Sequence, residues 1–127
     1  MKSATYAGLR LGRPISVNAM YRSVVWHGRV MSMKSTKYRK WEMDQTALLV
    51  LQNPPHIPGE YVAYITLPSN YRGDVDGAAK CFLDLLQNTG VTENDRNCVE
   101  LRIAKGCEKN ITAITLISKK RWDDGSE

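Results

Sequence analysis

The sequence predicts a single α+β domain, spanning residues 1–127, in which helices pack on one small mixed or antiparallel sheet. Two observations carry this prediction. Stretches with strand periodicity and stretches with helix periodicity follow one another in the order β-α-β-α-β-β. The composition, with 43% hydrophobic and 24% charged residues in a chain of 127, is that of one globular domain with its own core.

The N-terminal segments have the pattern of strands. Residues 5–11 alternate between apolar and polar or small side chains, which is typical of a strand with one buried face. Residues 22–26 and 29–32 are rich in β-formers, and only His27 and Gly28 separate them, which is the length of a tight hairpin turn. We therefore expect a strand followed by a β-hairpin.

A long helix is predicted after the hairpin, over residues 37–52. Ser35 or Thr36 supplies a hydroxyl that can cap its N-terminus. Residues 47–51 are apolar on every side of this helix, so we expect that part to be largely buried. Trp41 lies in the same helix and is expected to pack in the core rather than to stack on a ligand.

The second helix is predicted over residues 76–88. It follows a proline-rich loop at 53–59 and a strand at 61–67 that alternates and is rich in β-formers. Gly90 provides a stop after the helix. Apolar side chains recur at the i, i+3, i+4 and i+7 positions of one helix face, namely Ala79, Phe82, Leu83 and Leu86.

Two further segments of β-forming residues follow, at 98–105 and 111–118. A turn at 106–110 joins them, so we expect the two segments to pair with each other as a hairpin. Residues 120–127 are polar, and we expect them to form a frayed tail.

Charge is distributed unevenly along the chain. Residues 1–41 contain nine lysines and arginines and no acidic residue, whereas residues 42–127 contain nine basic and thirteen acidic residues, a net charge of −4. A surface normally mixes both signs, so a stretch at +9 favours a polyanionic partner over an incidental basic face. Aromatic rings that can stack on bases lie between these cations, namely Tyr21, Trp26, Tyr38 and Trp41.

Several other classes of protein are disfavoured. The three cysteines match neither a disulfide framework nor a zinc-binding C-x₂-C pair, and the two histidines lie in separate loops. The sequence therefore does not favour a zinc site or a catalytic thiolate. The longest apolar run, residues 47–51, is far shorter than the ~20 residues of a membrane span, and the N-terminus has no apolar secretory region. We expect a cytoplasmic protein with no membrane partner and no small-molecule cofactor.

The candidate catalytic residues lie in the segment Asp74-Val75-Asp76-Gly77-Ala78-Ala79-Lys80, which has a D-x-D-x-x-x-K pattern. In extended backbone, residues two apart point to the same side, so Asp74 and Asp76 can present both carboxylates to one spot. Lys80 follows one helical turn later. Its side chain leans toward the helix N-terminus and therefore back toward the two aspartates.

This acidic pair needs a cation, because two carboxylates about 5 Å apart repel by roughly 3 kcal/mol at an effective dielectric of 20. Mg²⁺ prefers such hard oxygen ligands and completes its shell with waters and phosphate oxygens. The pattern therefore indicates phosphodiester hydrolysis, in which Lys80 orients the attacking water or offsets charge in the transition state. Asp95 is the preferred third acid, ahead of Glu93 and Glu100.

Each of these residues also has an ordinary structural interpretation. Asp76 can be a helix N-cap, Asp74 a turn residue, and Asp95 a former of an Asx-turn. Lys80 can be a solvated helix residue. The conjunction of all four at a strand-to-helix junction, in a chain whose other half is basic, favours catalysis over four separate roles.

The segment resembles the core of the RusA family of Holliday-junction resolvases, which are small phage and prophage endonucleases. The likeness continues after Lys80 through Leu83-Asp84-Leu85-Leu86, Gly90-Val91 and Asn94-Asp95. Residues 14–22 are similar to that family's P-x-S-x-N-x-x-Y-R stretch, and residues 99–105 fit its strand after the acidic loop. Two positions depart from the pattern: Asn94 stands where a second acid is common, with Glu93 available in its place, and Gly77 stands where Asn is common.

The resemblance implies a homodimer that cuts four-way DNA junctions by paired symmetrical cleavage with Mg²⁺, for which Mn²⁺ is expected to substitute. It implies Asp74, Asp76 and Asp95 as the metal-binding acids and Lys80 as the catalytic lysine. The DNA contacts are expected from Arg13, Asn18, Tyr21, Arg22, Arg29, Lys34, Lys37 and Arg72.

Two other functions stay open on the sequence. One is a non-catalytic DNA-binding or recombination-accessory protein, in which the acids are caps and turn residues. The other is a protein-interaction module whose basic face binds an acidic partner. Magnesium-dependent nicking of DNA separates the nuclease from both, and competition by DNA separates the second from the first.

Overall fold

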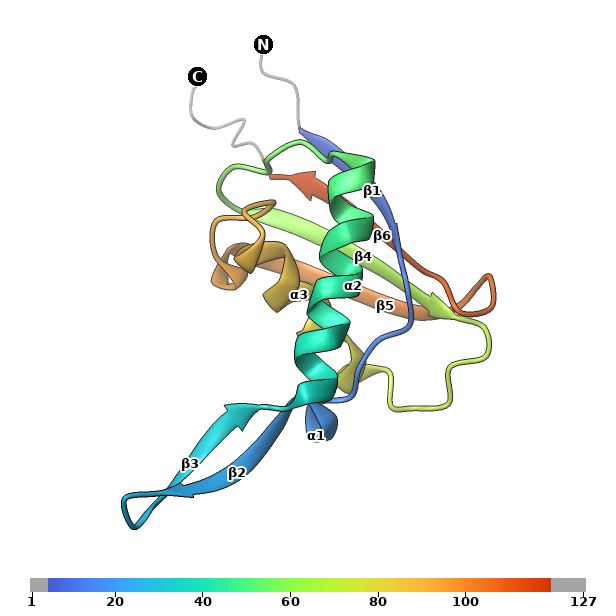
Figure 1. Ribbon diagram of the computed structural model, residues 1–127. Helices are drawn as coiled ribbons and strands as arrows, with labels where there is room; N and C mark the ends of the chain where they lie inside the picture. Colours follow the sequence, from blue (N-terminus) through green and yellow to red (C-terminus); the bar gives the residue numbers. More distant parts are fainter. Residues whose placement is uncertain (1–4, 120–127) are drawn as a thin grey trace.

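A four-stranded sheet in the order β1-β6-β4-β5 forms the centre of the computed structural model, which describes residues 5–119 (Figure 1). A separate two-stranded ribbon, β2-β3, projects from the body. The elements in chain order are β1 (Tyr6–Leu11), α1 (Val17–Met20), β2 (Tyr21–Trp26), β3 (Arg29–Lys34), α2 (Thr36–Gln52), β4 (Tyr61–Pro68), η1 (Asp76–Ala78), α3 (Ala79–Asn88), η2 (Asp95–Asn97), β5 (Cys98–Cys107) and β6 (Thr112–Ser118).

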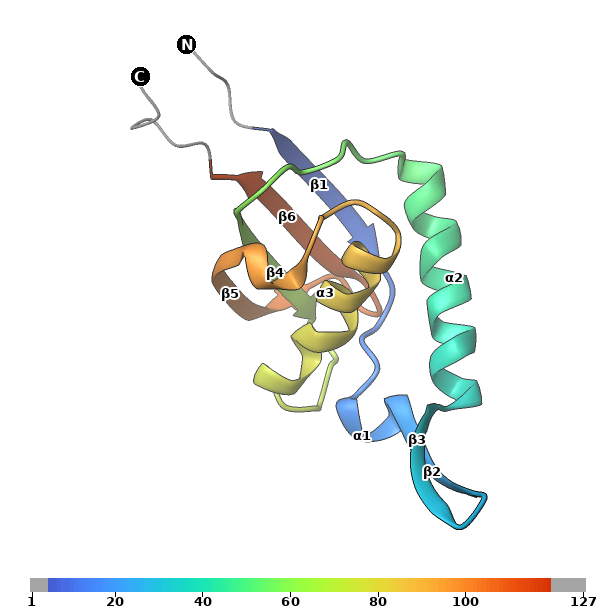
Figure 2. The same cartoon turned by 90° about the vertical axis from the view of Figure 1, so that its left-hand side faces the viewer.

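The sheet is mixed, which confirms the predicted α+β class. β6 lies between β1 and β4 and is antiparallel to both, whereas β5 runs parallel to β4. The chain reaches β5 from β4 through α3, which is the helical crossover that a parallel pair requires. Figures 1 and 2 show α2 and α3 over the same face of this sheet.

Alternation along the strands explains why one face is covered. Tyr61, Ala63, Ile65 and Leu67 of β4 are buried, and the residues between them are only half-buried. A sheet of this kind packs one face on a core and leaves the other open. The helices complete the core with side chains that include Tyr38, Leu49, Phe82, Leu85 and Leu86.

Both predicted helix ends are found. The Ser35 hydroxyl accepts a hydrogen bond from the Tyr38 N–H at 3.0 Å and caps α2. After α3, Gly90 has a φ of +82°, and the N–H of Val91 donates to the carbonyl of Leu86 at 2.9 Å. This Schellman arrangement confirms Gly90 as the stop.

The ribbon β2-β3 is the predicted hairpin, and each strand is slightly longer than expected. His27 and Gly28 occupy the turn with φ of +51° and +75°. Positive φ at both central residues defines a type I′ turn, whose twist matches that of the flanking strands. The helix α1, directly before the hairpin, is an element that the sequence does not predict.

Two predictions are wrong. β5 and β6 do not pair as a hairpin, because β4 lies between them. The late part of α2 is not largely buried: Val50 and Leu51 are 71% and 81% exposed, and Leu49 alone in the run 47–51 is buried. The helix meets the core along one stripe only, so the apolar residues on its outer side stay in solvent.

The remaining element predictions, for β1, α2, β4 and α3, are confirmed to within a few residues. Lys2 and the tail 120–127 lie outside the described residues. Within residues 5–119, no helix is long and apolar enough to cross a membrane.

Candidate functional site

Lys80 is held by an acid on its own helix. It lies in the first turn of α3, and its Nζ donates to Oδ1 of Asp84 at 3.2 Å. This hydrogen bond is the largest cause that raises the pKa of Lys80, and the negative charges of Asp84 and Asp95 add to the shift. The amine is therefore a fixed positive charge at neutral pH.

Asp84 is a site residue that the sequence analysis did not select. Its side chain is only 17% exposed, whereas that of Lys80 is 52% exposed, so the acid is set into the surface and the amine stands above it. The available signal is the i,i+4 spacing, which brings oppositely charged side chains together on one helix face. Asp84 therefore fixes where the amine of Lys80 lies, which is toward the C-terminal side of that residue and not back toward Asp74 and Asp76 as predicted.

Asp74 lies in a cavity of about 300 Å³ between the loop before η1 and the N-terminal segment. The other lining residues are Ser16, Val17, Asn18, Tyr71, Gly73 and Gly77. Residues 16–18 belong to the stretch that resembles the family's N-terminal motif. Two segments more than fifty residues apart in the sequence thus meet at this aspartate.

The structural interpretations of Asp76 and Asp95 are not supported. Asp76 is exposed in the first turn of η1, where no side chain caps the helix. Before η2, the side chain of Asn94 accepts from the N–H of Arg96 at 2.9 Å, so Asn94 rather than Asp95 makes the Asx-turn. Within residues 5–119, the carboxylates of Asp76 and Asp95 accept no hydrogen bond and are free for a ligand.

Asp95 is tied through its backbone to α3, the helix that also carries Lys80. Its N–H donates to Oε1 of Gln87 on α3 at 2.8 Å, which ties η2 to that helix. The charge of Asp95 acts on both Lys80 and Tyr61. Asp95 is therefore on the side of the molecule that carries Lys80.

The carboxylates of Asp74, Asp76 and Asp95 are the hard oxygen ligands that Mg²⁺ prefers. Within the described part of the chain, however, no three side chains among His, Cys, Asp and Glu lie close enough together to hold a metal ion. The gathering of Asp74, Asp76 and Asp95 around one ion therefore stays a prediction.

The other two candidate acids have structural partners. Glu93 accepts from the N–H of Gly59 at 3.0 Å and faces Nε2 of His56 at 3.4 Å. Glu100 accepts from Nε of Arg102 at 2.7 Å. Both acids are therefore engaged by protein partners in this arrangement, and neither is a preferred metal ligand.

A row of aromatic rings connects the root of the hairpin to α3. Tyr21 meets Tyr38 with ring centroids 5.7 Å apart, and Trp41 continues the row to Phe82 at 5.5 Å. Trp41 also donates from Nε1 to the carbonyl of Arg13 at 2.7 Å, which confirms that it packs. Tyr21, at the outer end of this row, is the first residue of β2, so the row links the root of the hairpin to the helix that carries Lys80.

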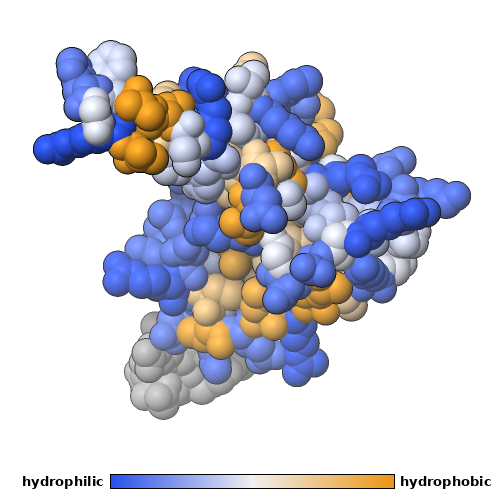
Figure 3. Space-filling view, turned by 90° about the horizontal axis from the view of Figure 1, so that it is seen from below, coloured by the Kyte–Doolittle hydropathy of each residue, from blue (hydrophilic) through white to orange (hydrophobic). Residues whose placement is uncertain are grey.

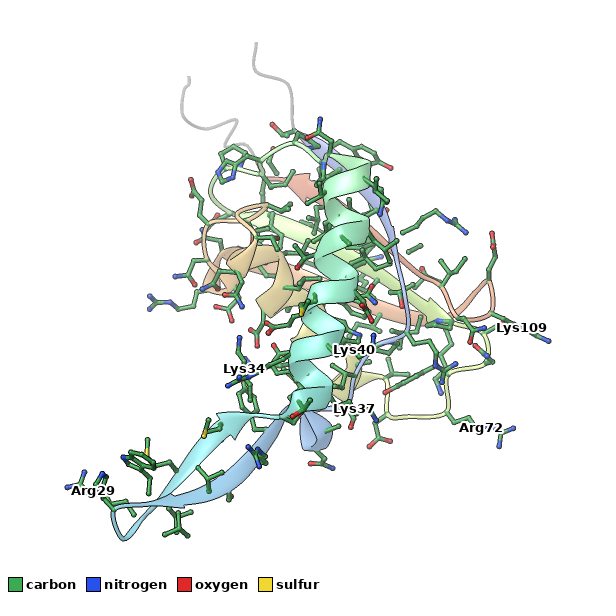
Figure 4. The ribbon with its side chains drawn as sticks, in the orientation of Figure 1. Arg29, Lys34, Lys37, Lys40, Arg72 and Lys109 are labelled. Carbon is green, nitrogen blue, oxygen red and sulfur yellow. The ribbon has the colours of Figure 1, made fainter. Side chains whose placement is uncertain are left out.

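The predicted DNA-binding cations fall into two groups. Lys34 donates to both carboxylate oxygens of Glu42, at 3.1 and 3.2 Å, and Arg13 donates to Asn110 at 3.2 Å. Four others are exposed and, within residues 5–119, have no ion pair: Arg22, Arg29, Lys37 and Arg72. In Figure 4, Arg29 stands at the hairpin tip, and Lys37 and Arg72 lie toward the same end of the molecule.

The structure thus shows an ammonium held on α3, the carboxylates of Asp76 and Asp95 without a hydrogen-bond partner within residues 5–119, and exposed guanidinium groups; that they act together at one site stays a prediction. Such a set can bind a phosphodiester and stabilise the negative charge that develops when it is attacked. A scan against protein-family models and a search of curated proteins find no match to this chain.

Proposed function

We propose that this protein is a Mg²⁺-dependent, structure-selective DNA endonuclease of the cytoplasm that resolves four-way junctions by paired symmetrical cleavage. One observation supports it most. The amine of Lys80 is held by Asp84 on α3, and a row of aromatic rings leads from that helix to the root of a hairpin whose arginines, Arg22 and Arg29, have no ion pair within residues 5–119. A catalytic charge next to a polyanion-binding arm is the arrangement that a nuclease needs.

In the proposed mechanism, Asp74, Asp76 and Asp95 would hold the metal. Bound Mg²⁺ supplies an activated water and a charge that stabilises the leaving oxygen. Lys80 contacts a non-bridging phosphate oxygen and offsets the charge that accumulates in the transition state. Asp84 holds the Lys80 amine in position, so the charge need not be ordered during the reaction.

Affinity for DNA is proposed to come from phosphate contacts by the four exposed cations, with Asn18 and Tyr21 nearer the site. Such contacts carry little sequence information, so selectivity would come from the shape of the junction. Each neutralised phosphate releases counterions, and we therefore expect affinity to fall steeply between low and physiological salt. An affinity that does not change with salt concentration would contradict the proposal that these cations bind DNA phosphates.

We also propose a homodimer, because a four-way junction has approximate two-fold symmetry and must be cut on two strands. The exposed outer side of α2 is the proposed interface. Met43, Ala47, Val50 and Leu51 fall at i, i+4, i+7 and i+8 and form one apolar stripe. The stripe borders a groove of about 820 Å³ that Arg39 and Glu42 also line.

The test is cleavage of a synthetic mobile four-way junction with and without Mg²⁺, resolved on native and denaturing gels. We expect paired symmetrical nicks that need Mg²⁺. Asp74→Asn, Asp76→Asn and Lys80→Ala should each abolish cleavage and keep junction binding, and the Asp→Asn changes should bind at least as tightly because repulsion of phosphate is lost. Asp74→Asn that cuts at the wild-type rate would refute the site.

A non-catalytic DNA-binding or recombination-accessory protein is the second candidate. The observation that favours it is that no three potential metal ligands are gathered within residues 5–119. It predicts junction binding with no Mg²⁺-dependent nicking of any DNA substrate. The same gels separate the two candidates, because binding and cleavage are read independently.

A further inference from the structure

We propose that the tip of the β2-β3 hairpin is a base-stacking arm that inserts Trp26 into the open centre of branched DNA. This inference rests on the proposed binding of branched DNA and adds to it a separate contact, to unstacked bases rather than to phosphates. It does not depend on cleavage.

The register of the hairpin sorts its side chains into two faces. Directly opposite residues share a face in an antiparallel pair, and the faces alternate along each strand. The pairs Trp26↔Arg29, Val24↔Met31 and Arg22↔Met33 therefore lie on one face. That face is an apolar stripe with one guanidinium group at the tip and another near the root.

This stripe lies in solvent. Trp26 is 64% exposed, Met31 45% and Met33 37%. Figure 3 shows the projecting hairpin from below, with a cluster of hydrophobic residues between hydrophilic ones. Large apolar side chains on a free arm indicate a surface that is covered in a complex.

The arm is fixed at its root and free at its tip. The N–H of Ser35 donates to the carbonyl of Met20 at 2.8 Å, and Tyr21 packs edge-on against the buried Tyr38. Each strand has six residues, so the arm reaches about 20 Å from this anchor at ~3.3 Å per residue. The type I′ turn at His27-Gly28 holds Trp26 at the far end.

The charge on the arm identifies its occupant as nucleic acid. Residues 21–34 contain Arg22, Arg29 and Lys34 and no acid, so an apolar protein surface alone leaves two guanidinium groups without partners. Arginine planes and an indole ring together suit nucleobases flanked by phosphates. Apolar wedges of this kind enter DNA between base steps.

The branch point is the favoured position along the DNA. Inserting a ring into intact duplex costs the unstacking of a base step, a few kcal/mol. At the centre of a junction, base pairs already have an open face, so that cost is reduced. The arm therefore favours branched DNA over duplex through Trp26.

The experiment measures binding without cleavage, in EDTA, with a junction that carries 2-aminopurine at the branch point and a duplex of the same sequence. We expect Trp26→Ala to bind the junction about tenfold more weakly than wild type and to bind the duplex within twofold of wild type. The 2-aminopurine signal should change on binding of wild type and Trp26→Phe and not on binding of Trp26→Ala.

Tyr6→Ala is the matched control, because Tyr6 is an aromatic residue that is 61% exposed on β1, away from the hairpin. It should bind like wild type. The proposal that Trp26 stacks on bases is contradicted if Trp26→Ala binds the junction as tightly as wild type does, or if the substitution weakens binding to the duplex as much as binding to the junction. It is also contradicted if sedimentation shows that the substitution instead disrupts self-association. Since the binding measurement is made in EDTA, where no cleavage occurs, it can be interpreted even if the protein proves not to be a nuclease.

Discussion

At the scale of single residues, one acid holds the amine of Lys80, and the carboxylates of Asp76 and Asp95 have no hydrogen-bond partner within residues 5–119. Lys80 and Asp84 form an i,i+4 ion pair on α3, with Asp84 largely buried beneath the amine. The D-x-D-x-x-x-K spacing is what selects Asp74, Asp76 and Lys80 as candidate site residues from the sequence. The prediction that Lys80 leans back toward Asp74 and Asp76 is wrong, because the amine pairs with Asp84 one turn further along α3, a choice that depends on side-chain rotamers and on how deeply Asp84 is set into the surface.

Asp84→Asn tests this positioning role. Asp84 raises the pKa of Lys80 through its hydrogen bond and its charge, so its removal lowers that pKa and frees the amine to move. We expect cleavage to slow by about 10- to 100-fold, with junction binding unchanged and the alkaline limb of the pH-rate profile moved to lower pH.

Asp44→Asn is the matched control, because Asp44 pairs with Lys40 at 3.0 Å in the same i,i+4 arrangement on α2. It should leave the rate and the pH profile unchanged. Equal effects of the two substitutions would show that Asp84 acts only through the net charge of the protein.

At the scale of elements, local periodicity was sufficient to predict most of the fold. The caps at Ser35 and Gly90 are local features, and both occur where the sequence places them. The pairing of β5 is not local. The short turn before β6 favours a hairpin, but the α3 crossover places β5 parallel to β4 and so puts β4 between the two strands.

The loop before β4 is clamped to the loop after α3 by an ion pair that predicts a pH dependence. The pKa of His56 is raised by its hydrogen bond to the carbonyl of Gly90 and by Glu93. The pKa of Glu93 is lowered by the N–H of Gly59 and by His56. The His56 contribution is complete below about pH 6.5 and disappears as pH rises through its raised pKa, whereas the Glu93 contribution is present above about pH 4.5.

His56→Ala should therefore lower the melting temperature more at pH 5.5 than at pH 8.5, by a small amount because the pair is exposed. Thermal unfolding followed by circular dichroism at the two pH values measures this. An equal loss for His56→Ala at both pH values would contradict the clamp.

At the scale of the whole molecule, the body carries two exposed apolar surfaces with different surroundings. The apolar face of the hairpin carries Arg29 at its tip and Arg22 near its root, whereas the α2 stripe is bordered by one cation and one anion, Arg39 and Glu42. Sequence alone predicts burial for residues 47–51 because they are apolar on every side. In the structure Val50 and Leu51 are exposed, and the proposed dimer would bury them between two copies of the chain.

Val50→Asp tests the α2 stripe as the dimer interface. A charge at a residue that is 71% exposed in the isolated chain does not disturb the core, but it places a carboxylate in the proposed contact. We expect sedimentation to show monomer, and junction products to change from paired to single nicks. Val99→Asp, at an exposed valine on β5, should remain dimeric, and a dimeric Val50→Asp would exclude this interface.

The central claim is that Asp74, Asp76 and Asp95 bind one divalent ion beside Lys80, and Mn²⁺ binding followed by electron paramagnetic resonance tests it most directly. The titration is made on wild type, Asp95→Asn and Glu100→Gln, since Glu100 is an acid with a partner of its own in Arg102. We predict that Asp95→Asn weakens Mn²⁺ binding at least tenfold and that Glu100→Gln leaves it unchanged. Wild-type affinity in Asp95→Asn would contradict the claim.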